Sequence, residues 1–193
     1  MKRIPHFAAA SVLAASALLG LASAPALAAP IVIDVAGAQS INLQGEAGNT
    51  MWFIDVGANA VLNSLSWSLD LEAFAPSVLS EMQVSFGGSS GLDLVTFAPG
   101  GADFASGVGS YSGSLDLGAF GLSVGADGLL RLEFSEAFKD FAPGVAEGEW
   151  QRGTLTFDVT AASAVPEPAS AALALLGLGL VLAVRARRAR PTP

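Results

Sequence analysis

Apolar and polar residues alternate along most of this chain between about residues 31 and 160. In LNSLSWSLDLEAF, for example, Leu65, Trp67 and Leu69 occupy every second position, with Ser66 and Ser68 between them. A period of two sends successive side chains to opposite faces of an extended strand. The pattern therefore predicts half-buried β-strands and excludes a helical bundle for this region.

Further short segments of this kind follow one another, separated by Gly, Pro, Ser and Asp. No stretch of the body has the length and period of a long helix. Strands are expected over residues 31–35, 41–43, 51–56, 62–74, 80–88, 92–97, 111–117, 122–124, 130–134 and 153–159. Many short strands with glycine-rich turns indicate an all-β, antiparallel β-sandwich or jelly-roll-like body, which we place over residues 29–163.

One stretch, GLSVGADGLLRLEF, has the composition of a β-hairpin. Asp127 and Gly128 form a dipeptide that favours a tight turn between alternating runs. We expect Arg131 and Glu133 to point outward. The residues expected to point inward are Leu122, Val124, Leu130, Leu132 and Phe134.

The composition excludes several kinds of chemistry. The chain has no cysteine and one histidine, His6. The body therefore has no disulfide framework, no zinc site of the usual ligands and no serine or cysteine triad. Between residues 29 and 168 the only basic residues are Arg131, Lys139 and Arg152, against all 17 acidic residues. We expect no nucleic-acid partner, since phosphate binding needs a basic surface.

The acidic residues raise two hypotheses, calcium binding and glycoside hydrolysis. The segment EAFKDFAPGVAEGE carries Glu136, Asp140, Glu147 and Glu149, whose oxygens are of the kind that binds calcium. It contains no EF-hand pattern. Hydrolysis needs two carboxylates at a defined separation, and the sequence singles out no pair, so we predict that the protein is not an enzyme.

The three tryptophans suggest contacts with carbohydrate. Trp67 is in phase with its apolar neighbours and is expected in the core, whereas Trp52 fits either the core or the surface. Trp150 lies in the polar stretch EGEWQRG and is the candidate for contact with a glycan. An anchoring tryptophan is an equally good interpretation of this position.

The N-terminal 28 residues have the anatomy of a secretory signal peptide. Lys2 and Arg3 precede an apolar stretch, and Ala26 and Ala28 fit the small-residue pattern that signal peptidase cleaves. Cleavage after Ala28 is expected.

The C-terminal segment 164–193 combines a proline-rich element, an apolar run and a basic end. Residues 169–184 are sixteen apolar or small residues, about 24 Å as a helix, and they form a short transmembrane span if the flanking arginines reach the headgroups. The arginines expected on the cytoplasmic side are Arg185, Arg187, Arg188 and Arg190. The body is then placed outside the inner membrane.

This tail, with Pro166, Glu167 and Pro168 ahead of the span and the arginines, resembles the PEP-CTERM sorting signal of Gram-negative bacteria. The resemblance implies recognition of these three residues by an exosortase, a membrane cysteine protease that cuts near them. It also implies a biofilm or exopolysaccharide setting. The alternative is a simple tail anchor in which Val-Pro-Glu-Pro is a stiff linker.

Together these features predict an exported protein of the cell envelope or extracellular matrix, with a structural or adhesive role. Its expected partners are signal peptidase, an exosortase, the inner membrane transiently, and exopolysaccharide. The alternative function is a carbohydrate-binding module of the same matrix.

Overall fold

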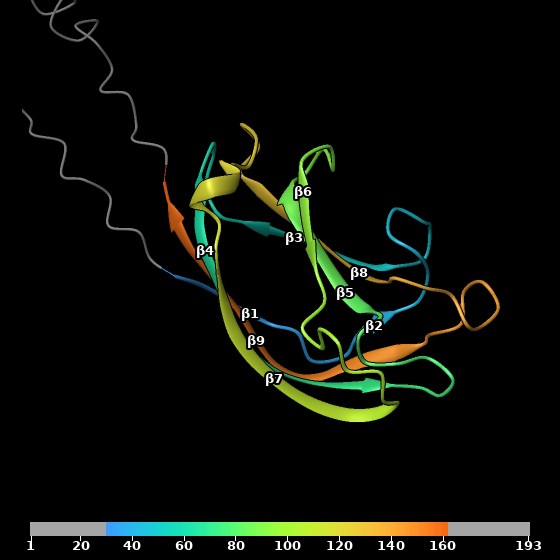
Figure 1. The fold of residues 1–193 in the computed structure, drawn as a ribbon. Coiled ribbons are helices and arrows are strands. Elements are labelled where there is room, and N and C mark those ends of the chain that lie inside the picture. The colour runs from blue at the N-terminus through green and yellow to red at the C-terminus, as the bar shows by residue number, and fades with distance from the viewer. Residues whose placement is uncertain (1–29, 162–193) are drawn as a thin grey trace, which may run out of the picture.

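The computed structural model describes residues 30–161, which form nine strands and one 3-10 turn (Figure 1). The predicted signal peptide and the predicted span over 169–184 lie outside the described residues. The elements are β1 (Ile31–Asp34), β2 (Ala38–Ser40), β3 (Thr50–Asp55), β4 (Val61–Ala73), β5 (Met82–Gly88), β6 (Leu94–Phe97), β7 (Gly107–Asp116), η1 (Gly118–Phe120), β8 (Leu129–Glu136) and β9 (Gly148–Thr160). Among residues 30–161, no helix is long and apolar enough to cross a membrane.

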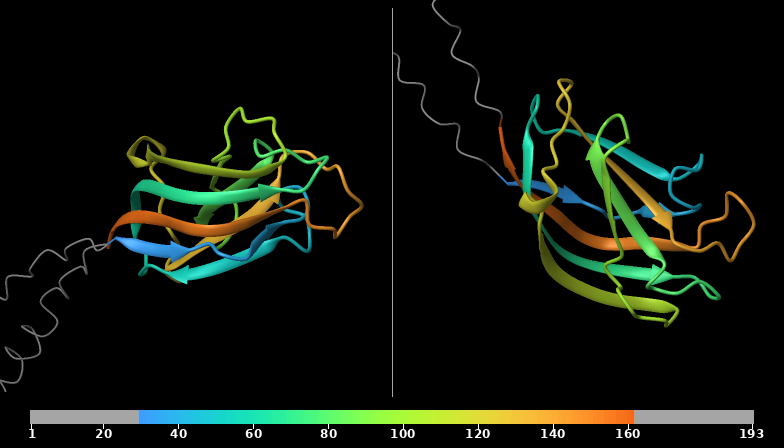
Figure 2. Two further views of the ribbon diagram at one scale, coloured as in Figure 1. Left: turned by 90° about the horizontal axis from the view of Figure 1, so that it is seen from below. Right: turned by 45° about the horizontal axis from the view of Figure 1, so that its top comes forward.

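The strands form two sheets in which every strand pair is antiparallel. Sheet A has the order β1-β9-β4-β7, with β2 also paired to β9, and sheet B has the order β3-β8-β5-β6. The sheets face each other, and Figure 2 shows the strands of sheet A side by side. The prediction of an all-β, antiparallel body is confirmed.

The core lies between the two sheets and follows the period-two pattern. In β4, Leu65, Leu69 and Leu71 are buried, while Ser66 and Ser68 on the opposite face are exposed. The alternate positions of β5 and β8 supply the other wall of the core, with Val84, Phe86, Leu130, Leu132 and Phe134. The hydrophobic effect thus sets which face of each strand is inside.

β9 organises sheet A because it pairs with β4 along one edge and with β1 and β2 along parts of the other. Ile31 pairs with Phe157, and Val61 pairs with Thr160, so the described chain begins and ends at the same end of the sandwich (Figure 1). We call this the terminal end. The loops 41–49, 74–81, 98–106 and 137–147 lie at the other end, which we call the loop end.

The predicted hairpin between Leu122 and Phe134 is wrong, although its turn forms. The N–H of Gly128 donates to the carbonyl of Gly125 at 3.0 Å. The N–H of Val124, however, donates to the carbonyl of Ala60, whereas β8 pairs with β3 and β5. The turn therefore connects the two sheets instead of joining neighbours in one sheet.

The strand predicted over residues 41–43 is also not formed, since β2 ends at Ser40. Leu43 makes only an isolated bridge to Glu136. Residues 41–49 are instead a loop that folds against sheet B, and its contacts are described below.

The close contact of β9 with β4 at Gly153 gives a test of this architecture. Gly153 has a φ of 115°, and a Cβ there would lie 2.1 Å from the carbonyl oxygen of Ser68. We expect Gly153→Ala to lower the free energy of unfolding by about 2 kcal/mol or more, because backbone atoms cannot move aside. Gly101→Ala is the control: its φ is also positive but its Cβ meets nothing within 4 Å, and we expect a loss of about 1 kcal/mol. Denaturant unfolding measures both, and equal losses would contradict the register.

Candidate functional site

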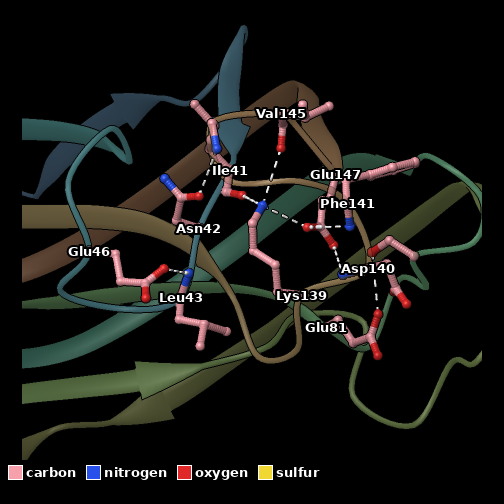
Figure 3. Close-up of polar contacts among 12 residues, drawn as sticks. Ile41, Asn42, Leu43, Glu46, Glu81, Lys139, Asp140, Phe141, Val145 and Glu147 are labelled. Atoms are coloured by element: carbon pink, nitrogen blue, oxygen red, sulfur yellow. Dashed lines mark hydrogen bonds and ion pairs between the residues drawn. The ribbon is translucent and has the colours of Figure 1, made fainter.

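A cluster of polar side chains at the loop end surrounds Lys139 and Glu147 (Figure 3). The ammonium of Lys139 lies 2.8 Å from Oε1 of Glu147. It also donates to the carbonyl oxygens of Ile41 and Val145. One lysine thus connects the loop 137–147 to the loop 41–49.

Glu147 is the acceptor at the centre of this cluster. It is fully buried, and its carboxylate accepts the N–H groups of Asp140 at 2.9 Å and Phe141 at 3.1 Å. Burial alone raises the pKa of such a group, but the hydrogen bonds from Lys139, Asp140 and Phe141 outweigh it and hold the pKa of Glu147 below its ordinary value. The ionised carboxylate closes the loop 137–147.

Asn42 joins the two loops from the other side. Its Oδ1 accepts the N–H of Gly144 at 3.1 Å, and its Nδ2 donates to the carbonyl of Ala47 at 2.8 Å. Its own carbonyl accepts the N–H of Glu136 at 2.9 Å. The loops 41–49 and 137–147 therefore form one hydrogen-bonded unit.

Glu136 is the unusual member of this region. It is 1% exposed, and neither of its carboxyl oxygens has a hydrogen-bond partner among the described residues. Burial, and next the nearby charge of Glu147, raises the pKa of Glu136 to about 8. Glu136 is therefore mostly protonated at neutral pH. Neither Glu136 nor Glu147 is accessible to a substrate in this arrangement.

The loop region does not form the calcium site considered from the sequence. Among residues 30–161, no three acidic or histidine side chains are placed to hold a metal ion together. The positive charge beside Glu147 is supplied by Lys139. Asp140 contributes its backbone N–H, and Glu149 lies on β9 beside Glu72.

Arg131 and Glu133 lie on the outer face of sheet B, as predicted, but they are not exposed to solvent. Both are buried, and Nη2 of Arg131 lies 2.5 Å from Oε2 of Glu133. Glu133 also accepts the N–H of Gly45 at 2.6 Å and Nδ2 of Asn49 at 2.8 Å. The loop 41–49 thus covers this face. The sequence gives no signal for this cover, because the partners are more than 80 residues apart.

Trp150 is buried, so the hypothesis that it is a surface contact for a glycan is wrong. Its ring lies 4.9 Å from that of Phe134 in an edge contact, and its Nε1 donates to Oγ of Ser40. The cause is an irregularity in β9: Asp70 pairs with Arg152 and Leu71 with Trp150, which leaves Gln151 as an extra residue. The extra residue reverses the inward and outward positions of β9.

The other two tryptophans are half-buried and also contact aromatic rings. The ring of Trp67 lies 4.8 Å from that of Phe97, and Trp52 lies 4.8 Å from Phe134. Both pack against the core, as expected for Trp67.

The predicted sorting and topology residues lie outside the described residues. These are Ala26, Ala28, Pro166, Glu167, Pro168, Arg185, Arg187, Arg188 and Arg190.

Comparison with protein families identifies the tail. A family model described as the PEP-CTERM protein-sorting motif matches residues 164–189. The chain therefore carries this motif, which confirms the resemblance and indicates an exported, envelope-associated protein sorted by an exosortase. A search of curated proteins finds no match.

Solved structures resemble the body only loosely. The VP2 subviral particle of infectious bursal disease virus aligns at a TM-score of 0.38 and 11% identity, over 74% of this chain and 35% of that one. Dimeric latent PorU from Porphyromonas gingivalis aligns at a TM-score of 0.36 and 11% identity, over 72% of this chain and 14% of that one. The chain spans about a third of the first relative and about a seventh of the second, and such likenesses carry no information about function.

The buried acid at position 136 gives a prediction about pH. The folded protein holds this proton up to about pH 8, whereas the unfolded chain loses it near the ordinary pKa of 4.5. Glu136 therefore lowers the free energy of unfolding as the pH rises between these values, by up to about 1.4 kcal/mol per unit. In Glu136→Gln this contribution is absent. The free energy of unfolding of the variant should therefore rise by about 2 kcal/mol or more relative to that of wild type between pH 5 and pH 8.

Denaturant unfolding at several pH values measures this difference. Glu149→Gln is the control, since Glu149 is also on a strand but is only half-buried. The groups facing Glu136 are Glu147, Glu81 and Lys139, and they are unchanged in both variants. If the free energies of unfolding of Glu136→Gln and wild type differ by the same amount at every pH, the raised pKa of Glu136 is contradicted.

Proposed function

We propose that the mature protein is a non-catalytic structural or adhesive component of the cell envelope or extracellular matrix. The sorting motif at residues 164–189 supports delivery to this location. The observation that carries the proposed role is the outer face of sheet A, which is rich in exposed hydroxyl groups.

The residues of this face lie in rows that cross all four main strands of the sheet. Each row brings side chains of β1, β9, β4 and β7 to the same level, and every member is exposed or half-buried. One row consists of Asp34, Thr154, Ser68 and Ser112, and the next of Val32, Thr156, Ser66 and Ser114. Neighbouring strands are about 4.8 Å apart, so the hydroxyls form a dense array that favours hydrogen bonding to a hydrated polymer.

The alternative role as a carbohydrate-binding module has less support. Its proposed contact, Trp150, lies in the core, and Trp52 and Trp67 pack against other rings. A lectin that stacks sugars on tryptophan would need an open ring face. A matrix role that uses the hydroxyl face does not need an open tryptophan ring.

Before processing, the apolar segment 169–184 would anchor the chain in the inner membrane, with the terminal arginines on the cytoplasmic side. The exosortase would then act near Pro166, Glu167 and Pro168 and release the body.

The anchoring and processing steps predict the behaviour of Glu167→Ala. Export should be intact, because the leader and the arginines are unchanged, but uncleaved protein should accumulate in the inner membrane. Cells of a host that carries an exosortase would be fractionated, and the intact mass of the product would be measured. Full-length membrane protein in both wild type and variant would favour the simple tail anchor.

The hydroxyl face predicts how firmly the mature protein is held in the matrix. Ser66→Ala, Ser68→Ala, Ser112→Ala and Ser114→Ala together should weaken retention in the extracellular polymer fraction by about thirtyfold, because each lost hydrogen bond contributes about 0.5 kcal/mol or more. The melting temperature should change little. A control variant, Ser80→Ala, lies at the loop end, off this face, and should be retained like wild type. Mature wild-type protein found free in the medium would contradict the matrix role.

A further inference from the structure

A groove lies at the terminal end of the sandwich, away from the loop cluster. It consists of two adjoining hollows of about 290 and 340 Å³ that share Asp93 and Ser123. The β5–β6 hairpin, residues 88–95, forms one wall, and residues 120–125 form the other. The segments that build the groove are thus close in space and separate in sequence.

The walls of the groove offer both main-chain and apolar contacts. Leu94 and Val95 belong to β6, which ends sheet B, and no described strand pairs with its second edge. Phe120, in the opposite wall, is 54% exposed, and Leu92 at the tip of the hairpin is 85% exposed. A free strand edge beside exposed apolar side chains suits an extended peptide, which adds to the edge and places alternate side chains against the walls.

The position of the groove relative to the sorting motif is fixed by strand pairing. Thr160 pairs with Val61, and Val61 bridges to Ser123, so two strand spacings, about 10 Å, separate the end of β9 from the groove. Only the five residues 161–165 separate Thr160 from Pro166. Fully extended, this segment reaches at most about 20 Å. The loop end is farther away by the length of β9, about 40 Å.

We propose that this groove is a docking surface for the exosortase that processes the tail. An enzyme acting at Pro166, Glu167 and Pro168 works within about 30 Å of the groove, and an extended, exported segment of that enzyme is the occupant that the β6 edge and Phe120 fit. Binding at the groove would keep the short connection, residues 161–165, close to the protease. The proposal rests on the sorting motif and is independent of the matrix role.

The test uses the full-length chain in a host that carries an exosortase, with the rate of tail removal as the measurement. Phe120→Asp and Ser123→Arg place a charge in the groove at exposed positions, and each should slow processing by about tenfold, the loss typical of a central contact. Phe138→Asp is the matched control: this phenylalanine is 59% exposed, at the loop end, and its variant should be processed like wild type. Melting temperatures show whether the variants remain folded.

A second arm inserts ten Gly-Ser residues between Thr160 and Pro166 in each background. The longer connection uncouples docking from cleavage, so the tail of the otherwise wild-type chain should be removed more slowly. In this background the groove substitutions should have no further effect on the rate of tail removal. Groove variants processed at the wild-type rate would overturn the proposal and leave the groove to a lipid or a second copy of the chain. The proposal would also be overturned if the groove substitutions slowed tail removal by the same factor with the long connection as with the short one. Wild type that is never processed would overturn sorting itself, and docking with it.

Discussion

Contacts between aromatic rings hold the two sheets together, and the rest of the structure depends on them. Because the chain has no cysteine, no disulfide can join the sheets. Phe157 of sheet A instead packs edge-on against Phe86 of sheet B at 5.1 Å, and Trp150 packs against Phe134 at 4.9 Å. Such pairs add about 0.5–1.5 kcal/mol each beyond the area they bury. Both of these rings of sheet A belong to β9, the strand that pairs on two edges. Trp67 of β4 adds a third contact between the sheets, to Phe97 of β6 at 4.8 Å.

Polar groups complete the body where the aromatic core ends. At the loop end, the buried ion pair of Lys139 and Glu147 satisfies backbone groups of two loops that have no strand partners. On the outer face of sheet B, Glu133 pairs with Arg131 and accepts the backbone N–H of Gly45 in the loop 41–49. Removing one partner of a buried pair is strongly destabilising, because the other charge is left without compensation. Glu136 avoids this penalty by remaining protonated near neutral pH, since its pKa is about 8.

The sequence predicted those parts of the structure that depend on local alternation. Residues 65–73 of β4 and 82–86 of β5 follow from period two, because their inner positions are apolar and their outer positions polar. Trp150 was placed at the surface because its neighbours in the sequence are polar, whereas β9 extends through this stretch and the extra residue Gln151 turns Trp150 inward. The burial of Glu133 depends on Gly45 and Asn49, and the groove depends on a hairpin and a connection far apart in the chain. Alternation carries no information about such long-range pairing.

The pairing of β1 with β9 bears on how the two proposed binding surfaces are arranged on one small body. Because these strands are antiparallel neighbours, Ile31 and Thr160 lie at the same end of the sandwich, and Thr160 is two strand spacings from the groove. β9 then runs about 40 Å to the loops at the other end, and the hydroxyl rows of sheet A lie along the sides between them. The surface next to the sorting motif and the surface proposed for the matrix are therefore separate. A substitution on the hydroxyl face can change adhesion while the processing enzyme still meets an unchanged terminal end, which lets sorting and retention be altered independently.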